Sequence, residues 1–157
     1  MPEKPAPLAA VLLMLVHDVM LGFWGLLLLI LPERVLTVSA ESYVGLTWDA
    51  IVQSTGREAQ LVINYMRFWG LEGLLMALVI TLVTVFPYRK GALWAWITLL
   101  ICGSVGWLGA VALDIQLGLL SITYIDIVPL LLCWVSLAVS AKAVFSSRRA
   151  HPASAAL

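Results

Sequence analysis

The chain has 157 residues, of which 62% are hydrophobic and only 11% are charged. Soluble globular domains average about 45–50% apolar and about 25% charged residues, so this composition is typical of an integral membrane protein with a single domain. Nine basic residues balance nine acidic residues, which leaves no net positive charge for binding a nucleic acid. The two cysteines exclude a disulfide scaffold and a four-cysteine zinc site.

Four segments are long and apolar enough to cross a bilayer, which takes about 20 residues of helix. In chain order they are residues 8–31, 61–86, 91–116 and 122–145. The first is longer than the apolar core of a signal peptide and no cleavage site follows it, so we interpret it as a retained helix. We therefore predict an all-α fold, a four-helix transmembrane bundle that forms one domain over residues 1–157.

Basic residues in the short connections predict the orientation of the bundle. Six lie on the side that carries both termini, and two lie on the opposite side, in the first loop. The six are Lys4, Arg89, Lys90, Lys142, Arg148 and Arg149, and the two are Arg34 and Arg57. This asymmetry predicts that both termini are cytoplasmic. We expect residues 146–157 to form a short disordered cytoplasmic tail.

The first loop, residues 32–60, is the long outer connection of the predicted bundle. Many of its residues are apolar, and Thr47 is placed to cap a short helix that begins at Trp48. We expect this loop to lie on the outer membrane surface as a lid, with Tyr43 and Trp48 at the level of the lipid headgroups. The alternative is a solvated connector.

Small residues predict how the helices approach one another inside lipid. The third span carries Cys102, Gly106 and Ala110 at four-residue spacing, which predicts one close-packing face. The other spans carry the pairs Gly22 and Gly25, Gly73 and Ala77, and Ser136 and Ser140. Because the turn between the second and third spans is short, we expect these two spans to be antiparallel neighbours. The third and fourth spans should also be neighbours.

Three ionisable residues fall near the middle of the predicted membrane, namely His17 and Asp18 in the first span and Glu72 in the second. An ionisable residue there costs about 2.5–3.5 kcal/mol on insertion, which makes each a candidate functional residue. Asp18 shares a helix face with Gly22 and Gly25, so it should point into the bundle. His17 points about 100° away from Asp18, so the two should not face the same neighbour. Two carboxylates at one depth indicate a shared proton or a shared cation.

A second group of ionisable residues falls near the outer ends of the spans. Gln60, Asn64 and Arg67 form a polar stripe on the second span, Asp114 ends the third, and Asp126 begins the fourth. One arginine between two aspartates predicts a cluster that floors a cavity under the first loop. The alternative is a salt bridge that only fixes helix register, with an aspartate at a span end lying in water.

Sequence motifs exclude several kinds of chemistry. Cys102 and Cys133 stand alone on different spans, and one histidine within the spans is too few for bis-histidine haem ligation by one chain. Phosphate-binding, zinc-protease and serine-hydrolase motifs are absent. We therefore predict no metal and no cofactor.

Three sequence segments carry a resemblance to a known group of proteins. They are R-F-W-G-L-E-G from Arg67 to Gly73, Y-R-K-G-A-L-W-A-W from Tyr88 to Trp96, and G-L-T-W-D from Gly45 to Asp49. Together they resemble small uncharacterised four-span bacterial membrane proteins, grouped loosely with DoxX-like proteins. The resemblance implies a four-helix fold and a multi-pass location in the bacterial inner membrane, and it implies no activity and no catalytic residues.

These observations support three hypotheses of function. The first is a non-enzymatic membrane protein that binds a lipid-like or quinone-like ligand, or that acts as an accessory subunit of a larger membrane complex or as a homo-oligomer. The second is an isomerase-like membrane enzyme that uses Asp18 and Glu72 on an apolar substrate, by analogy with the four-span architecture of sterol isomerases. The third is a small proton- or cation-coupled transporter.

Overall fold

The computed structural model describes residues 4–116 and 123–149, and this part of the chain is helical with no strand. The helices are α1 (Leu8–Ile30), α2 (Pro32–Val44), α3 (Trp48–Val83), a π-helical turn η1 (Thr84–Tyr88), α4 (Leu93–Gln116) and α5 (Thr123–Arg149). Four of them are long and apolar enough to cross a membrane, which confirms the predicted all-α, four-span architecture. Residues 117–122 and 150–157 lie outside the described residues, and the expectation of a disordered tail is wrong for residues 146–149, which belong to α5.

The predicted outer loop is largely helical. Thr47 caps α3, because its hydroxyl oxygen accepts a hydrogen bond from the Ala50 amide at 3.3 Å, and this confirms the predicted helix start at Trp48. The helix continues from there into the second span through a kink at Thr55, where the backbone leaves helical geometry (φ −135°, ψ 30°). The second span is therefore the continuation of a helix that begins in the outer loop.

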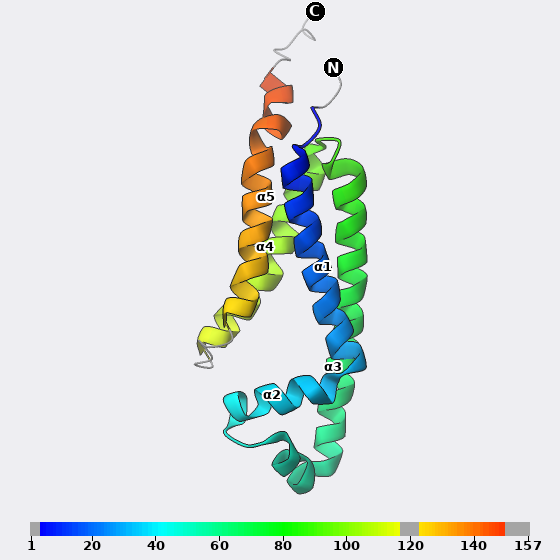
Figure 1. Ribbon diagram of the computed structural model, residues 1–157, viewed down its shortest axis with the longest axis vertical. Helices are drawn as coiled ribbons and strands as arrows, with labels where there is room; N and C mark the ends of the chain where they lie inside the picture. Colours follow the sequence, from blue (N-terminus) through cyan, green and yellow to red (C-terminus); the bar gives the residue numbers. More distant parts are fainter. Residues whose placement is uncertain (1–3, 117–122, 150–157) are drawn as a thin grey trace, which may run out of the picture.

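The helix α2 folds back against the first turns of α3 and closes a small hydrophobic core of its own. Its buried members are Leu36, Ala40, Trp48, Ala59 and Ile63. Figure 1 shows α2 lying across the end of α1, roughly perpendicular to the long helices. Some apolar residues of the loop therefore pack on one another, while Val38, Val44, Leu46 and Val52 are exposed. The Trp48 side chain, predicted at the headgroup level, is buried in this core, and the side chain of Tyr43 lies outside the described residues.

The helix α1 is the centre of the bundle. It packs against α3 on one side and against α5 on the other, and α4 packs against α5. The start of α1 and the end of α5 lie at one end of the molecule, here called the inner end, and α2 lies at the other, the outer end (Figure 1). The third and fourth spans are neighbours, as predicted.

The expectation that the second and third spans are close neighbours is wrong, because α3 and α4 share little contact. The turn between them contains the π-helical segment η1 and Gly91, whose φ of 86° favours glycine. A short turn fixes only the ends of two helices. Here α1 fits against α3 so closely that it takes the place expected for α4.

Glycines allow that fit. A Cβ atom at Gly25 would lie 2.8 Å from the Leu74 amide nitrogen, and one at Gly70 would overlap the backbone of Leu29. A Cβ atom at Gly73 would lie 3.3 Å from the Gly25 Cα. The predicted close-packing faces of the first and second spans are confirmed, and Gly70 belongs to them.

The close-packing face predicted for the third span is wrong. Cys102 is exposed, and a Cβ atom at Gly106 would meet nothing within 4 Å. The face that packs contains Leu99 and Gly103, and at Gly103 an added Cβ would overlap the Cys133 sulfur. Two faces of this helix have residues at four-residue spacing, one with Cys102 and Gly106 and the other with Leu99 and Gly103. Packing against α5 decides which of the two faces is buried.

Candidate functional site

The side chains of His17 and Asp18 lie at the middle of α1, and both are buried, with 0% and 2% of their surfaces exposed. The His17 Nδ1 atom lies 3.0 Å from the Asp18 Oδ1 atom. The two side chains leave the helix about 100° apart and still contact each other. Both are buried because α3 and α5 pack on different sides of the central helix α1.

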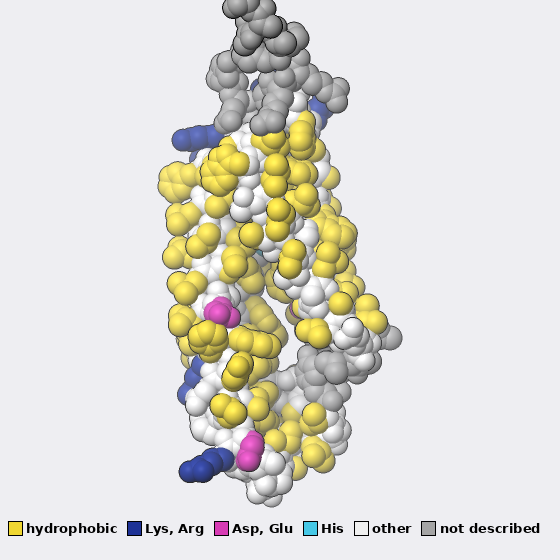
Figure 2. Space-filling view, turned by 180° about the vertical axis from the view of Figure 1, so that it is seen from behind, with side chains coloured by type: hydrophobic (Ala, Val, Ile, Leu, Met, Phe, Trp, Pro, Cys, Tyr) yellow, Lys and Arg dark blue, Asp and Glu magenta, His cyan; other side chains and the backbone are white. Residues whose placement is uncertain are grey.

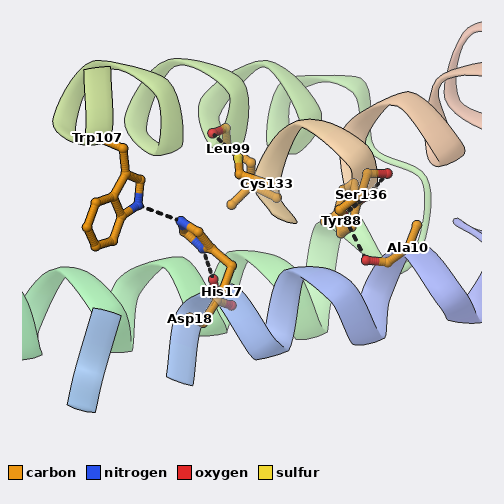
Figure 3. Close-up of polar contacts among 8 residues, drawn as sticks. All are labelled: Ala10, His17, Asp18, Tyr88, Leu99, Trp107, Cys133 and Ser136. Atoms are coloured by element: carbon orange, nitrogen blue, oxygen red, sulfur yellow. Dashed lines mark hydrogen bonds and ion pairs between the residues drawn. The ribbon is translucent and has the colours of Figure 1, made fainter. Parts of the chain in front are cut away.

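Trp107 of α4 completes this cluster. Its indole Nε1–H donates a hydrogen bond to His17 Nε2 at 2.9 Å, as Figure 3 shows. An imidazole nitrogen that accepts a hydrogen bond carries no proton, so the proton of a neutral His17 is on Nδ1. In this arrangement, Nδ1–H donates to the Asp18 carboxylate. The tryptophan therefore fixes the tautomer of the histidine.

One oxygen of Asp18 is left without a partner. Its Oδ2 atom is buried and makes no hydrogen bond. Cys133 of α5 lies near Asp18, and its S–H points to the Leu99 carbonyl at 3.8 Å. A buried carboxylate oxygen with no partner is costly, because it has lost its bonds to water.

Glu72 is not part of this cluster. Its side chain is exposed, while Gly70 and Gly73 on the same helix face α1. Two residues beyond Gly70 is about 200° around a helix, so Glu72 points away from α1. The structure therefore does not bring Asp18 and Glu72 together. The two carboxylates, predicted at one depth, face different surroundings.

The outer group of predicted residues divides into two. Asp114 of α4 is buried and its side chain is a hydrogen-bonding partner of the partly buried Asp126 of α5. A hydrogen bond between two carboxyl groups requires one proton, and Asp114 Oδ2 has no partner. In the described residues the ion pair is that of His17 with Asp18, so the exposed Arg67 pairs with neither aspartate. The predicted triad fails because α1 stands between α3 and the α4–α5 pair.

Arg67 instead lines an open groove beneath α2. The groove has a volume of about 640 Å³ and lies where α1 ends, α2 starts and α3 passes. Its lining residues are Ile30, Leu31, Pro32, Glu33, Arg34, Thr37, Trp48, Asp49, Val52, Gln60, Ile63 and Arg67. A polar cavity under the outer loop was predicted, and the groove has the predicted Arg67 and Gln60, but neither aspartate.

Sequence reasoning missed Trp107 as a partner of the histidine. The signal that could have found it is Gly103, four residues earlier on the same face of the helix. An added Cβ there would lie 4.0 Å from His17 Nε2, so the absence of a side chain leaves room for the indole to reach the ring.

Within residues 4–116 and 123–149, no group of three or more His, Cys, Asp or Glu side chains is placed to hold a metal ion. Comparison with known proteins adds no relative. No family model matches the sequence, and no significant match is found among curated proteins or solved structures. The proposals below therefore rest on the geometry of the chain itself.

Proposed function

We propose that this multi-pass membrane protein binds a lipid-like or quinone-like molecule in the groove beneath α2. The observation that carries the proposal is the position of the groove. It opens where the apolar helix α1 ends, and its walls combine apolar side chains with two arginines, Arg34 and Arg67. A site of this kind suits a molecule with a polar head and an apolar tail.

The size and chemistry of the groove fit such a ligand. Its volume of about 640 Å³ lies within the range of about 300–1,000 Å³ typical of small-molecule sites. The planar guanidinium groups of Arg34 and Arg67 suit a phosphate or carboxylate, and Gln60 adds a hydrogen-bonding side chain. Glu33 and Asp49 also line the groove, so the site holds charges of both signs.

The surface next to the groove supports the binding of an apolar tail. Ile30, at the end of α1, lines the groove and is 61% exposed, and Phe23, two turns earlier, is also 61% exposed. Figure 2 shows hydrophobic side chains covering one face of the molecule between its two ends, with few charged side chains among them. A tail that leaves the groove would continue over a surface of this kind.

The test uses the full chain purified in mild detergent and placed in bilayers that contain an anionic phospholipid with a photoreactive tail. Wild type should crosslink to this lipid at the groove, and Arg67→Gln should crosslink about tenfold less, because a hydrogen bond to a charged group contributes about 1.5–3 kcal/mol. Arg57→Gln is the matched control, since Arg57 is exposed on the same helix outside the groove. Equal crosslinking of Arg67→Gln and wild type, or crosslinks spread evenly over the helices, would overturn the proposal.

A second candidate function, as an accessory subunit of a membrane complex, is favoured by Glu72. This carboxylate is exposed within a membrane-spanning helix, among hydrophobic side chains such as Trp69 and Leu75, which are 56% and 55% exposed. A charged side chain that faces lipid is costly, and a helix of another protein with a basic or hydrogen-bonding side chain would lower this cost. Native mass spectrometry of the protein released from its own membrane tests this function. A bound protein that Glu72→Gln loses supports it, and a lone chain contradicts it.

We also propose that the protein lies in a bacterial inner membrane with both termini in the cytoplasm, and that it is related to DoxX-like proteins. The excess of basic residues on the terminal side supports the orientation. Reporter fusions to each terminus test it, and a periplasmic signal from either fusion would contradict it.

A further inference from the structure

The Trp107–His17 hydrogen bond joins two helices whose backbones do not pack directly on each other. No Cα atom of α4 lies within 8 Å of a Cα atom of α1. In Figure 1 the outer parts of α4 and α5 lean away from α1, and Figure 2 shows a hollow between the helices in the half of the molecule nearer α2. Across this separation the indole reaches the imidazole at 2.9 Å.

This hydrogen bond depends on the protonation state of His17. An indole nitrogen can only donate, so Trp107 needs a lone pair on Nε2. A protonated imidazole has an N–H at both nitrogens and has no lone pair to offer. A proton on Nε2 and the hydrogen bond from Trp107 therefore exclude each other.

A proton on His17 would change the net charge of the buried His17–Asp18 pair. With Nδ1–H donating to the Asp18 carboxylate, the pair carries one negative charge, and Asp18 Oδ2 has no partner that would stabilise it. One more proton makes the pair an imidazolium and a carboxylate with no net charge, which reduces the cost of burying it.

Within residues 4–116 and 123–149, the pair makes no ion pair with a lysine or an arginine. The titratable group that α5 places near Asp18 is Cys133, and α4 contributes the neutral Trp107. On α3, Ala77 packs against Gly22, one helical turn from Asp18, and the charged residues Arg67 and Glu72 are exposed.

We propose that His17 Nε2 is a proton-binding site and that Trp107 blocks it by donating its indole N–H to the same nitrogen. Uptake of one proton from the aqueous phase breaks the Trp107–His17 hydrogen bond and frees the outer half of α4 from α1. Release of the proton restores the bond. The inner half of α4 stays in place, because the Trp96 indole donates to the Leu137 carbonyl at 3.0 Å and Leu99 is buried against α5. This proposal does not depend on ligand binding in the groove beneath α2.

The first test is nitrogen NMR of full-length protein labelled at histidine and tryptophan, in lipid nanodiscs. The variant His151→Gln leaves His17 as the single histidine, since the chain has two. At high pH the ring should be the Nδ1–H tautomer with Nε2 unprotonated. As the pH falls, Nε2 should gain a proton and the Trp107 indole N–H signal should shift to that of an unbonded indole. An Nε2–H tautomer at high pH, a Trp107 signal that stays unchanged while His17 is protonated, or a ring that gains no proton between about pH 4 and 9 would overturn the proposal.

The second test is amide hydrogen exchange along α4, expressed as protection factors so that the intrinsic effect of pH is removed. In wild type the outer half of α4, residues 105–116, should lose protection as the pH falls, and the inner half, residues 93–100, should not. The variant Trp107→Phe keeps an aromatic ring but has no N–H, so its outer half should be about fivefold less protected at high pH, because a lost hydrogen bond costs about 1 kcal/mol. The variant should also show no further loss on acidification.

The control is Trp134→Phe, which removes an indole hydrogen bond of the same length, 2.9 Å, from α5 to the Ser104 hydroxyl of α4. Serine does not titrate in this range, so this variant should keep the pH dependence of the wild type. Wild-type pH dependence in Trp107→Phe would overturn the proposal. If Trp107→Phe does not fold, the tautomer and protonation of His17 in the His151→Gln protein decide the matter.

Discussion

The buried polar side chains differ in their hydrogen bonding between the inner and outer halves of the bundle. In the inner half, the Tyr88 hydroxyl from η1 lies 2.9 Å from the hydroxyls of both Ser136 and Ser140, and Ser136 donates to the Ala10 carbonyl at 2.7 Å. At mid-membrane and in the outer half, the carboxylates of Asp18 and Asp114 each keep one buried oxygen without a partner. The Thr84 hydroxyl is also unpartnered in the inner half, but it is neutral.

This difference indicates that the inner half of the bundle stabilises the fold, whereas the outer half carries polar groups available for function. The inner network ties α1, η1 and α5 into one unit with hydrogen bonds between neutral groups. The outer half has ionisable groups with free oxygens and an open groove, and its helices diverge (Figure 1). Unsatisfied buried groups are rare in folded proteins and call for an explanation, such as a ligand, a proton or an ion.

The largest effect is expected at the α1–α3 contact on which both halves depend. Gly70→Ala places a methyl group against the backbone of Leu29, so it should lower the free energy of unfolding by about 3 kcal/mol, at the upper end of the cost of overpacking. Denaturant titration in mixed micelles measures this loss. Gly106→Ala is the matched control on α4, where an added Cβ meets nothing within 4 Å, and its stability should be unchanged or slightly higher. Equal effects of the two variants would contradict the close approach of α1 and α3.

A smaller effect is expected from breaking the inner network. Tyr88→Phe removes the hydroxyl that joins Ser136 and Ser140, and this should cost about 1–2 kcal/mol of stability, since the hydrogen bonds of that hydroxyl to two buried serines are lost. The same micelle titration measures it. Tyr124→Phe serves as the control, because that residue is 63% exposed on α5. If the two tyrosine variants are equally stable, the inner half is not the stabilising half.

The smallest effect is expected at the outer acid pair. In Asp126→Asn an amide N–H can donate to the Asp114 carboxylate without a shared proton, so stability at neutral pH should rise by about 0.5 kcal/mol. Glu58→Gln, at an exposed position on α3, should leave stability unchanged. Thermal melting in the same micelles compares the two. A loss of more than about 1 kcal/mol in Asp126→Asn would show that the charge of Asp126 itself is needed.

Much of the fold could be predicted, because a helix that crosses the bilayer must have about 20 mainly apolar residues. The first and third spans agree with α1 and α4 to within two residues, and the capped helix start at Trp48 is as predicted. The site could be predicted only in part. His17 and Asp18 are visible as ionisable residues in an apolar span, but their contact with each other and with Trp107 is not, since Trp107 is 90 residues from His17 along the chain.

The sequence by itself determined how many helices can cross the membrane and which residues are costly to bury there. Only the tertiary structure decided which of these residues meet. The reason is physical: hydrophobicity and helix geometry are local properties, whereas the order of helices depends on which surfaces fit. The fit of Gly25 against Gly70 places α1 at the centre. That placement buries Asp18 beside His17, leaves Glu72 exposed, and separates Arg67 from the two outer aspartates.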